Sequence, residues 1–187
     1  MVTNIIKEIS IQEFLALPET KPASEYINGQ IIQKPMPKGK HSRIQTQLSA
    51  AINNKLQPEK IAVAFSELRC TFGDRSIVPD ISVFKIDRIP RDDRGEIADS
   101  FQIAPDWVIE ILSPDQSPAR VTKNIIHCLI NDTKLGWLIE PSDRSVLVYY
   151  AKQQPAFFES NTDVLPVPEF ASSFQLNLEN LFSWLKL

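Results

Sequence analysis

The run DWVIEIL at residues 106–112 is the most apolar in the chain, and it constrains the fold more than any other segment. Its length and its β-branched and aromatic residues predict a strand in the centre of a sheet. Ser117 and Pro118 follow as an N-cap and a proline at the first helical position, so a helix is expected to run to about Asn131. The runs GWLIE and SVLVYY then predict a hairpin-like pair of strands.

The residues before this strand supply further helices and strands. Ser10 and Glu13 have the spacing of a capping box that opens a short helix. Asn28-Gly29 lies between two β-prone runs, a pattern typical of a β-hairpin. Apolar residues at helical spacing from 44 to 56 predict a longer helix. Because no repeat or linker interrupts this order, residues 1–187 are expected to form a single α+β domain. Further strands are expected at residues 61–65, 68–72 and 79–84.

Size and composition are those of one globular domain. The chain has 187 residues, of which 43% are hydrophobic and 23% charged, and this profile excludes disorder, collagen and coiled coils. The two cysteines do not predict a disulfide framework. No run approaches the ~18 apolar residues of a membrane span, and the first residues lack the pattern of a signal peptide. The expected location is therefore the cytoplasm.

Positive charge is concentrated in residues 30–60. The formal net charge of −3 argues against a protein that coats nucleic acid without selectivity. Residues 30–60 nevertheless have a balance of +5, so the rest of the chain has −8. This segment is either a solvated helix face or a surface that contacts phosphate. Its basic residues are Lys34, Lys38, Lys40, Arg43, Lys55 and Lys60.

Glu110 is the unexpected residue in the central strand, because a buried carboxylate is costly unless a positive charge meets it. It is a member of a structural ion pair, an edge residue that faces water, or a metal ligand that needs a second carboxylate. Asp106 shares its strand face but lies about 13 Å away, too far to bind the same ion. Asp80 begins a different strand and could lie within ~5 Å of Glu110 across a sheet. Two carboxylates from adjacent strands would suit Mg²⁺.

Several short motifs resemble a known family. PDISVF, PDWVIEILSPDQSPARVTK and LGWLIEP occur in this order, with EYINGQII and His41 upstream. Together they resemble the Uma-two family, a group described as restriction endonucleases and placed in the PD-(D/E)xK nuclease superfamily. The resemblance covers about residues 10–150 and leaves 151–187 as a C-terminal extension. It implies a restriction endonuclease-like mixed β-sheet flanked by helices, and a metal-dependent endonuclease that hydrolyses phosphodiester bonds of DNA.

The same resemblance implies roles for individual residues. Asp80 and Glu110 are the expected ligands of Mg²⁺ or Mn²⁺, and Glu25, just before the Asn-Gly turn, matches an upstream glutamate that joins them. The superfamily lysine should stand two residues after the glutamate, where this chain has Leu112. The family commonly carries its lysine in the following helix, so Lys123 is expected to complete the catalytic set. The alternative is that Lys123 is only a surface cation.

Other residues extend or weaken this interpretation. His41, with Lys38, Lys40 and Arg43, is a candidate for contact with nucleic acid, although a histidine at a helix start is more often structural. Glu67 could line the same cleft. The chain departs from the family pattern in two places, with His127 where an aromatic residue is usual and Gly136-Trp137 in place of a Tyr-Trp pair.

These departures keep two other hypotheses open. The first is a catalytically inactive nuclease-like domain that binds nucleic acid or a partner protein. The second is a structural protein whose acids are ion-paired inside the fold, in which case a change at Asp80 would cost only stability. Since superfamily members that cut both strands usually work as dimers, a homodimer is also expected by analogy.

Overall fold

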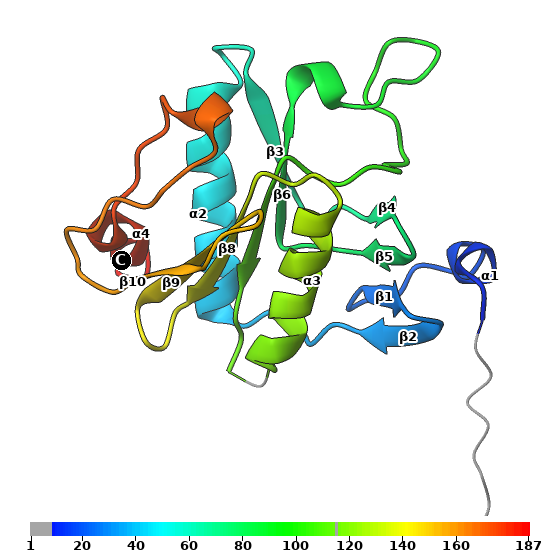
Figure 1. The fold of residues 1–187 in the computed structure, drawn as a ribbon, viewed down its shortest axis with the longest axis horizontal. Coiled ribbons are helices and arrows are strands. Elements are labelled where there is room, and N and C mark those ends of the chain that lie inside the picture. The colour runs from blue at the N-terminus through cyan, green and yellow to red at the C-terminus, as the bar shows by residue number, and fades with distance from the viewer. Residues whose placement is uncertain (1–8, 115) are drawn as a thin grey trace, which may run out of the picture.

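The computed structural model describes residues 9–114 and 116–187 of the chain (Figure 1). It contains a six-stranded sheet of order β10-β9-β8-β7-β6-β3 and a four-stranded sheet of order β2-β1-β5-β4. The larger sheet consists of β3 (Ala62–Ser66), β6 (Ile81–Lys85), β7 (Trp107–Ile111), β8 (Leu135–Glu140), β9 (Ser145–Tyr150) and β10 (Ala156–Phe158). The smaller sheet consists of β1 (Ser24–Ile27), β2 (Gln30–Gln33), β4 (Cys70–Phe72) and β5 (Arg75–Ile77).

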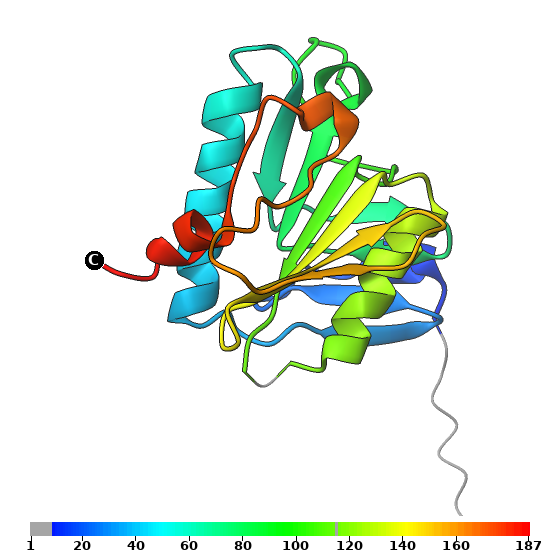
Figure 2. The same ribbon diagram turned by 60° about the vertical axis from the view of Figure 1, so that its left-hand side comes forward.

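Helices cover both faces of the larger sheet. Figure 2 shows α2 and the C-terminal segment on one face and α3 on the other. No helix among the described residues is both long and apolar enough to cross a membrane. The helices are α1 (Ile11–Leu15), α2 (Gly39–Leu56), α3 (Pro118–Ile130) and α4 (Leu178–Ser183), with 3₁₀ turns η1 (Ile86–Arg88) and η2 (Glu169–Ala171).

Strand β7 lies inside the larger sheet, as its apolar sequence predicts. It pairs antiparallel with β6 and parallel with β8, so the sheet is mixed, and α3 is the crossover between the parallel strands. Ile109 and Ile111 pack in the core under α2, whereas Val108 and Leu112 pack in the second core under α3. This alternation places Glu110 on the α3 face of the sheet.

The local signals near the N-terminus are confirmed. Ser10 accepts a hydrogen bond from the backbone N–H of Glu13, and the Glu13 side chain accepts one from the backbone N–H of Ser10. The hairpin between β1 and β2 turns at Asn28 (φ 51°) and Gly29 (φ 78°), the left-handed conformation that an Asn-Gly pair tolerates best. This hairpin sets the direction in which the chain approaches α2.

The C-terminal segment is part of the main core, although the sequence motifs end before it. Leu165, Phe174 and Leu181 are buried against the same face of the sheet as α2. The indole N–H of Trp137 donates to the carbonyl oxygen of Pro166 at 2.8 Å. Residues 151–187 therefore complete the fold that the preceding residues begin.

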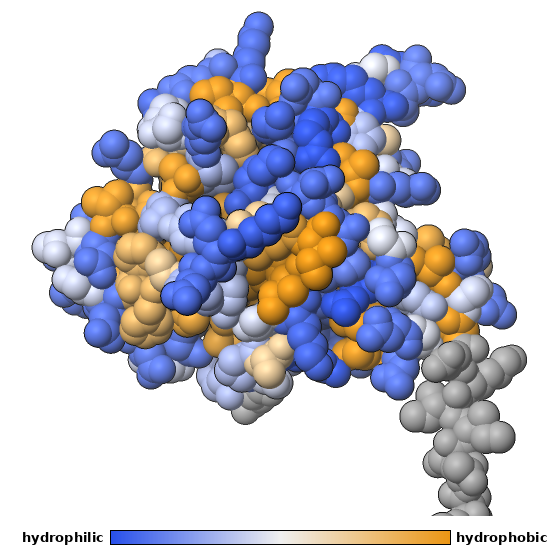
Figure 3. All heavy atoms as spheres, viewed as in Figure 1, coloured by the Kyte–Doolittle hydropathy of each residue, from blue (hydrophilic) through white to orange (hydrophobic). Residues whose placement is uncertain are grey.

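Helix α3 leaves an apolar strip exposed to solvent. Ile126 and Ile130 are 43% and 76% exposed, and Figure 3 shows hydrophobic side chains over this helix. The opposite face of α3 buries Val121, Ile125 and Cys128 against the sheet. The helix therefore has one buried face, although its sequence is apolar on most sides.

Candidate functional site

Asp80 and Glu110 lie side by side at the junction of β6 and β7. The register pairs Ile81 with Ile109, so Asp80 stands opposite Glu110. The backbone N–H of Asp80 donates to Glu110 Oε2 at 3.4 Å, and both side chains are buried. The expected approach of these two carboxylates across the sheet is confirmed.

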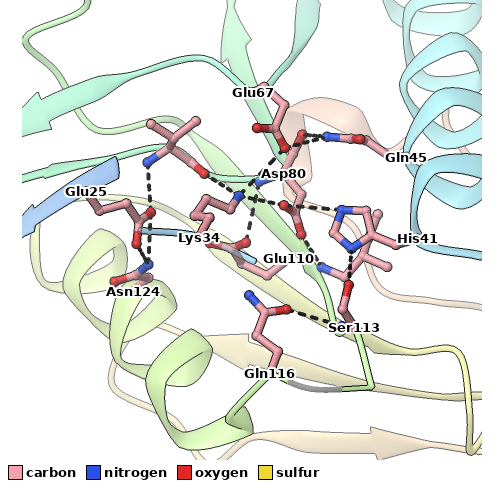
Figure 4. A network of polar contacts seen from close by, with 12 residues as sticks. Glu25, Lys34, His41, Gln45, Glu67, Asp80, Glu110, Ser113, Gln116 and Asn124 are labelled. Carbon is pink, nitrogen blue, oxygen red and sulfur yellow. Dashed lines mark hydrogen bonds and ion pairs between the residues drawn. The ribbon is translucent and has the colours of Figure 1, made fainter. Parts of the chain in front are cut away.

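Glu25 reaches the same place from β1 of the smaller sheet. Its Oε1 accepts a hydrogen bond from the backbone N–H of Val78 at 2.9 Å. The amide of Asn124 on α3 donates to both of its carboxylate oxygens, at 3.2 and 3.3 Å. Glu25 and Glu110 line one pocket between the hairpin and α3. The three predicted acids thus converge, as Figure 4 shows.

Lys34 supplies the amine that meets these acids, and the sequence interpretation did not single it out. It follows β2, and its Nζ lies 2.7 Å from Asp80 Oδ1, 2.7 Å from the carbonyl oxygen of Val78 and 3.7 Å from Glu67 Oε1. Its side chain is 11% exposed. The only sequence signal was its membership of the basic segment, because the turn of the hairpin decides where the residue after β2 points.

Lys123 lies elsewhere, contrary to the expected role. Its side chain is exposed on α3, on the same side as Ile126, and lines a hollow with Arg75 and Arg120. Leu112, in the superfamily lysine position, is buried in the core under α3. Only one face of α3 can pack on the sheet, so Lys123 and the apolar Ile126 are both left exposed on its outer side.

The charges at the site depend on one another. Burial opposes the positive charge of Lys34, but the carboxylates of Asp80 and Glu110 outweigh burial and hold the Lys34 pKa above its ordinary value. Burial alone would raise the Asp80 pKa, yet Lys34 and His41 hold it below its usual range. Burial and the nearby charge of Asp80 raise the Glu110 pKa well above its ordinary value. The site therefore combines an ionised Asp80, a charged lysine and a glutamate that retains its proton easily.

His41 belongs to this site and does not cap α2 or face solvent. It is buried near the start of α2, with Nε2 3.4 Å from Asp80 Oδ1 and Nδ1 3.2 Å from Ser113 Oγ. Glu67 Oε1 lies 3.7 Å from Lys34 Nζ and accepts a hydrogen bond from Gln45 Nε2 at 3.1 Å. These contacts place His41 and Glu67 beside the predicted acids, although neither could be located from sequence spacing.

The other predicted residues have different surroundings. Lys38 and Lys40 are exposed at the start of α2. Arg43 is also exposed, and its Nε donates to the carbonyl oxygen of Trp184 at 3.1 Å. Asp106 forms an ion pair with Arg88 at 2.7 Å, which agrees with its exclusion as a partner of Glu110.

The acid pocket adjoins a basic hollow. Ile32 and Arg120 line both, so the two cavities meet at this pair. Arg75, Arg120 and Lys123 surround the second hollow, between the β1–β2 hairpin and the start of α3. Glu25 and Glu110 therefore lie in a small pocket next to a surface hollow lined by basic residues.

Comparison with known proteins identifies the family of the chain and its fold. The sequence model of Uma2, described as "Putative restriction endonuclease", matches residues 11–179. A crystal structure of a "putative nuclease belonging to DUF820" from Anabaena variabilis ATCC 29413 is 59% identical, with a TM-score of 0.93, and the match covers 95% of this chain and 99% of that one. None of the curated proteins matches. The chain belongs to the Uma2 family and has its nuclease-like α+β fold.

Proposed function

We propose that this chain is a divalent-metal-dependent endonuclease that hydrolyses phosphodiester bonds of DNA, with Mg²⁺ or Mn²⁺ as cofactor. The observation that carries the proposal is the buried convergence of Glu25, Asp80 and Glu110 around the amine of Lys34. Membership of a family described as restriction endonucleases supports the same class of reaction. The nuclease description of the structural neighbour also supports it.

Glu25, Asp80 and Glu110 supply the donor chemistry of a divalent-cation site, although among the described residues it is His41, Glu67 and Asp80 whose ligand atoms all lie within 4.8 Å of one another. Oxygen donors from separate elements are the ligands that a hard ion such as Mg²⁺ takes. The position of Lys34 Nζ, 2.7 Å from Asp80 Oδ1, indicates that positive charge is already favoured there. Glu25, Asp80 and Glu110 would hold the ion, which supplies an activated water and stabilises charge on the leaving oxygen.

The backbone prepares these residues for that task. Asp80 Oδ2 accepts a hydrogen bond from the backbone N–H of Ile111 at 2.7 Å, and Val78 holds Glu25 in the same way. These bonds fix the carboxylates without help from the substrate, which limits the reorganisation that catalysis would need. In the proposed reaction, Lys34 provides the positive charge for the scissile phosphate that Leu112 cannot provide.

A substrate bound in the basic hollow would lie next to the pocket that contains Glu25 and Glu110. Arg75, Arg120 and Lys123 would bind phosphates next to the cleaved bond. Lys38 and Lys40, exposed at the start of α2, would contact more distant phosphates. These contacts carry no base specificity, so the proposal includes no target sequence.

Cleavage of supercoiled plasmid in Mg²⁺ or Mn²⁺ tests the proposal. The wild-type protein should convert plasmid to nicked or linear product, and Asp80→Asn should lower the rate at least about a hundredfold because it removes a charge that the metal requires. Cleavage that survives Asp80→Asn unchanged would come from a contaminant.

A matched pair of lysine variants assigns the catalytic amine. Lys34→Met should lower cleavage at least about tenfold because it removes the charge at the acids. Lys123→Met should mainly weaken DNA binding, since Lys123 lies in the adjoining hollow. The opposite ranking would restore Lys123 to the role that the family pattern implies.

A second candidate is a nuclease-fold protein that binds nucleic acid or a partner without cutting. Leu112 in the lysine position and the ion pair between Lys34 and Asp80 favour it, because an internal cation can neutralise the site permanently. It predicts DNA binding measured by fluorescence anisotropy with no cleavage in either metal.

A purely structural role predicts that Asp80→Asn alters stability and neither binding nor cleavage. A homodimer and a cytoplasmic location stay predictions.

A further inference from the structure

His41 has a buried ring nitrogen without a hydrogen-bond partner. Its side chain is only 5% exposed, and Nε2 makes no hydrogen bond within the described part of the chain. This atom lies 3.4 Å from Asp80 Oδ1. Buried polar atoms are normally satisfied, so this ring nitrogen, directed at a carboxylate, is available as a ligand for a cation that binds beside the two.

The opposite side of the ring is held in place. His41 Nδ1 lies 3.2 Å from Ser113 Oγ, and the backbone N–H of Ser113 donates to Gln116 Oε1 at 3.2 Å. A hydrogen bond at one ring nitrogen sets the orientation of the imidazole and directs the other nitrogen to a metal. Figure 4 shows this chain from Gln116 through Ser113 to His41.

Glu67 provides a second carboxylate near His41 and Asp80. Gln45 Nε2 donates both to Glu67 Oε1 at 3.1 Å and to the carbonyl oxygen of Asp80 at 2.8 Å. One ligand atom from each of His41, Glu67 and Asp80 lies within 4.8 Å of the other two. Small side-chain rotations would bring three atoms so placed to the distances of about 2.0–2.3 Å at which nitrogen and oxygen bind a metal.

Lys34 marks where positive charge is favoured in this group. Its Nζ contacts Asp80 Oδ1 at 2.7 Å and lies 3.7 Å from Glu67 Oε1. The ammonium group is therefore close to two of the three ligand atoms. A metal ion that binds both carboxylates would compete with this ammonium group for them.

We propose that His41, Glu67 and Asp80 bind a divalent transition-metal ion, and that Lys34 leaves Asp80 when the ion enters. This position is additional to the site made by Glu25, Asp80 and Glu110. An imidazole ligand suits Mn²⁺, Fe²⁺ or Zn²⁺ better than Mg²⁺. The inference rests on the proposed function for the place of Asp80 in a nuclease site, but its test measures metal binding instead of cleavage.

Titration of the metal-free full-length protein with MnCl₂, followed by electron paramagnetic resonance, tests the inference. Wild-type protein should bind Mn²⁺ about tenfold more tightly than Mg²⁺, with electron spin-echo modulation from a directly bound ¹⁴N nucleus. His41→Gln should remove that modulation and weaken Mn²⁺ binding about tenfold. Glu67→Gln should weaken binding while the nitrogen signal stays, and because Glu67 is 43% exposed this variant should fold normally.

His127→Gln is the matched control, because the chain has two histidines and the ring of His127 stacks on Phe72 and faces the exposed Asp74. This variant should keep both the affinity and the nitrogen signal. Absence of the ¹⁴N signal in the wild type, or its survival in His41→Gln, would overturn the inference.

The outcomes separate the inference from the proposed function. If Glu110→Gln abolishes Mn²⁺ binding while His41→Gln and Glu67→Gln leave it unchanged, the site made by Glu25, Asp80 and Glu110 stands. The additional site is then overturned. A nitrogen-ligated Mn²⁺ in a protein that never cuts DNA would support the inference and count against the nuclease.

Discussion

Glu110 makes the stability of the protein depend on pH in a direction that can be stated in advance. Burial, and then the charge of Asp80, raise its pKa above the ordinary 4.5 in the folded protein. Below pH 4.5 both folded and unfolded chains hold the proton, so Glu110 imposes no penalty. As pH rises towards the folded-state pKa, only the folded chain retains the proton, and this contribution to stability is progressively lost.

Glu110→Gln should therefore stabilise the metal-free protein at higher pH. Its free energy of unfolding should exceed that of the wild type on the order of 1 kcal/mol at pH 8, because a neutral amide replaces a buried charge. The difference should shrink towards pH 4.5. Urea unfolding in EDTA at a series of pH values measures it, with Glu159→Gln on the surface as control. An unchanged pH dependence in Glu110→Gln would contradict the assignment.

The sequence could locate some residues of the site and not others. Asp80 and Glu110 could be paired because strand spacing limits which carboxylates meet across a sheet. Lys34 and Glu67 could not be placed, because both follow short strands whose turns determine their direction. His41 matches the family pattern, but no spacing in the sequence predicts that it lies beside Asp80.

At the scale of elements, Gly136 lets α3 pack closely on β8. A Cβ at position 136 would lie 2.3 Å from Ile125 Cγ2 and 3.3 Å from Val108 Cγ1. Close packing of Ile125 and Val108 therefore explains why this chain has a glycine where the family usually has an aromatic residue. Asn124, next to Ile125, holds Glu25, so this contact also helps to position the acids.

Gly136→Ala should lower the free energy of unfolding by about 1–3 kcal/mol because the helix must move away from the sheet. Ile125→Ala removes the obstructing methyl group, so the double variant should be about 1 kcal/mol more stable than the sum of the single effects. Urea unfolding of the four proteins measures this coupling. Strict additivity would show that the two residues do not compete for the same space.

The positions of the helices could be predicted from the sequence more readily than the helix faces that are buried. The start of α3 follows from Ser117 and Pro118, and the central strand follows from its apolar run. The orientation of α3 does not follow, since apolar residues on most of its sides allow several faces to be buried. Strand β5 is three residues long and is defined by its partners β1 and β4 rather than by its own sequence.

At the scale of the whole molecule, the C-terminal segment supplies side chains that complete the larger hydrophobic core. Phe174 contacts Trp107, with ring centroids 6.2 Å apart, and Trp137 donates to Pro166. The recognisable motifs end near residue 150, but buried side chains continue to Phe182. The motifs identify the site, whereas the apolar residues of the tail are too generic in sequence to reveal their partners.

Truncation after Asp163 should abolish cooperative unfolding. It would remove Leu165, Phe174 and Leu181 from the core, a loss comparable with the several kcal/mol that stabilise a typical domain. Removal of Leu187 alone, which is fully exposed, is the control and should have no effect. Near-ultraviolet circular dichroism during urea unfolding distinguishes the two. A sharp transition in the long truncation would contradict the assignment of this segment to the core.

The late position of these covering residues also affects how the chain is made. A ribosome releases residues 165–182 only after every strand of the larger sheet has emerged. Until then, the tryptophan-bearing face of the sheet has no cover over part of its area, and nascent chains could associate through it. The larger core therefore cannot form completely before this segment has left the ribosome, and slow or interrupted translation near it should favour aggregation of the nascent protein.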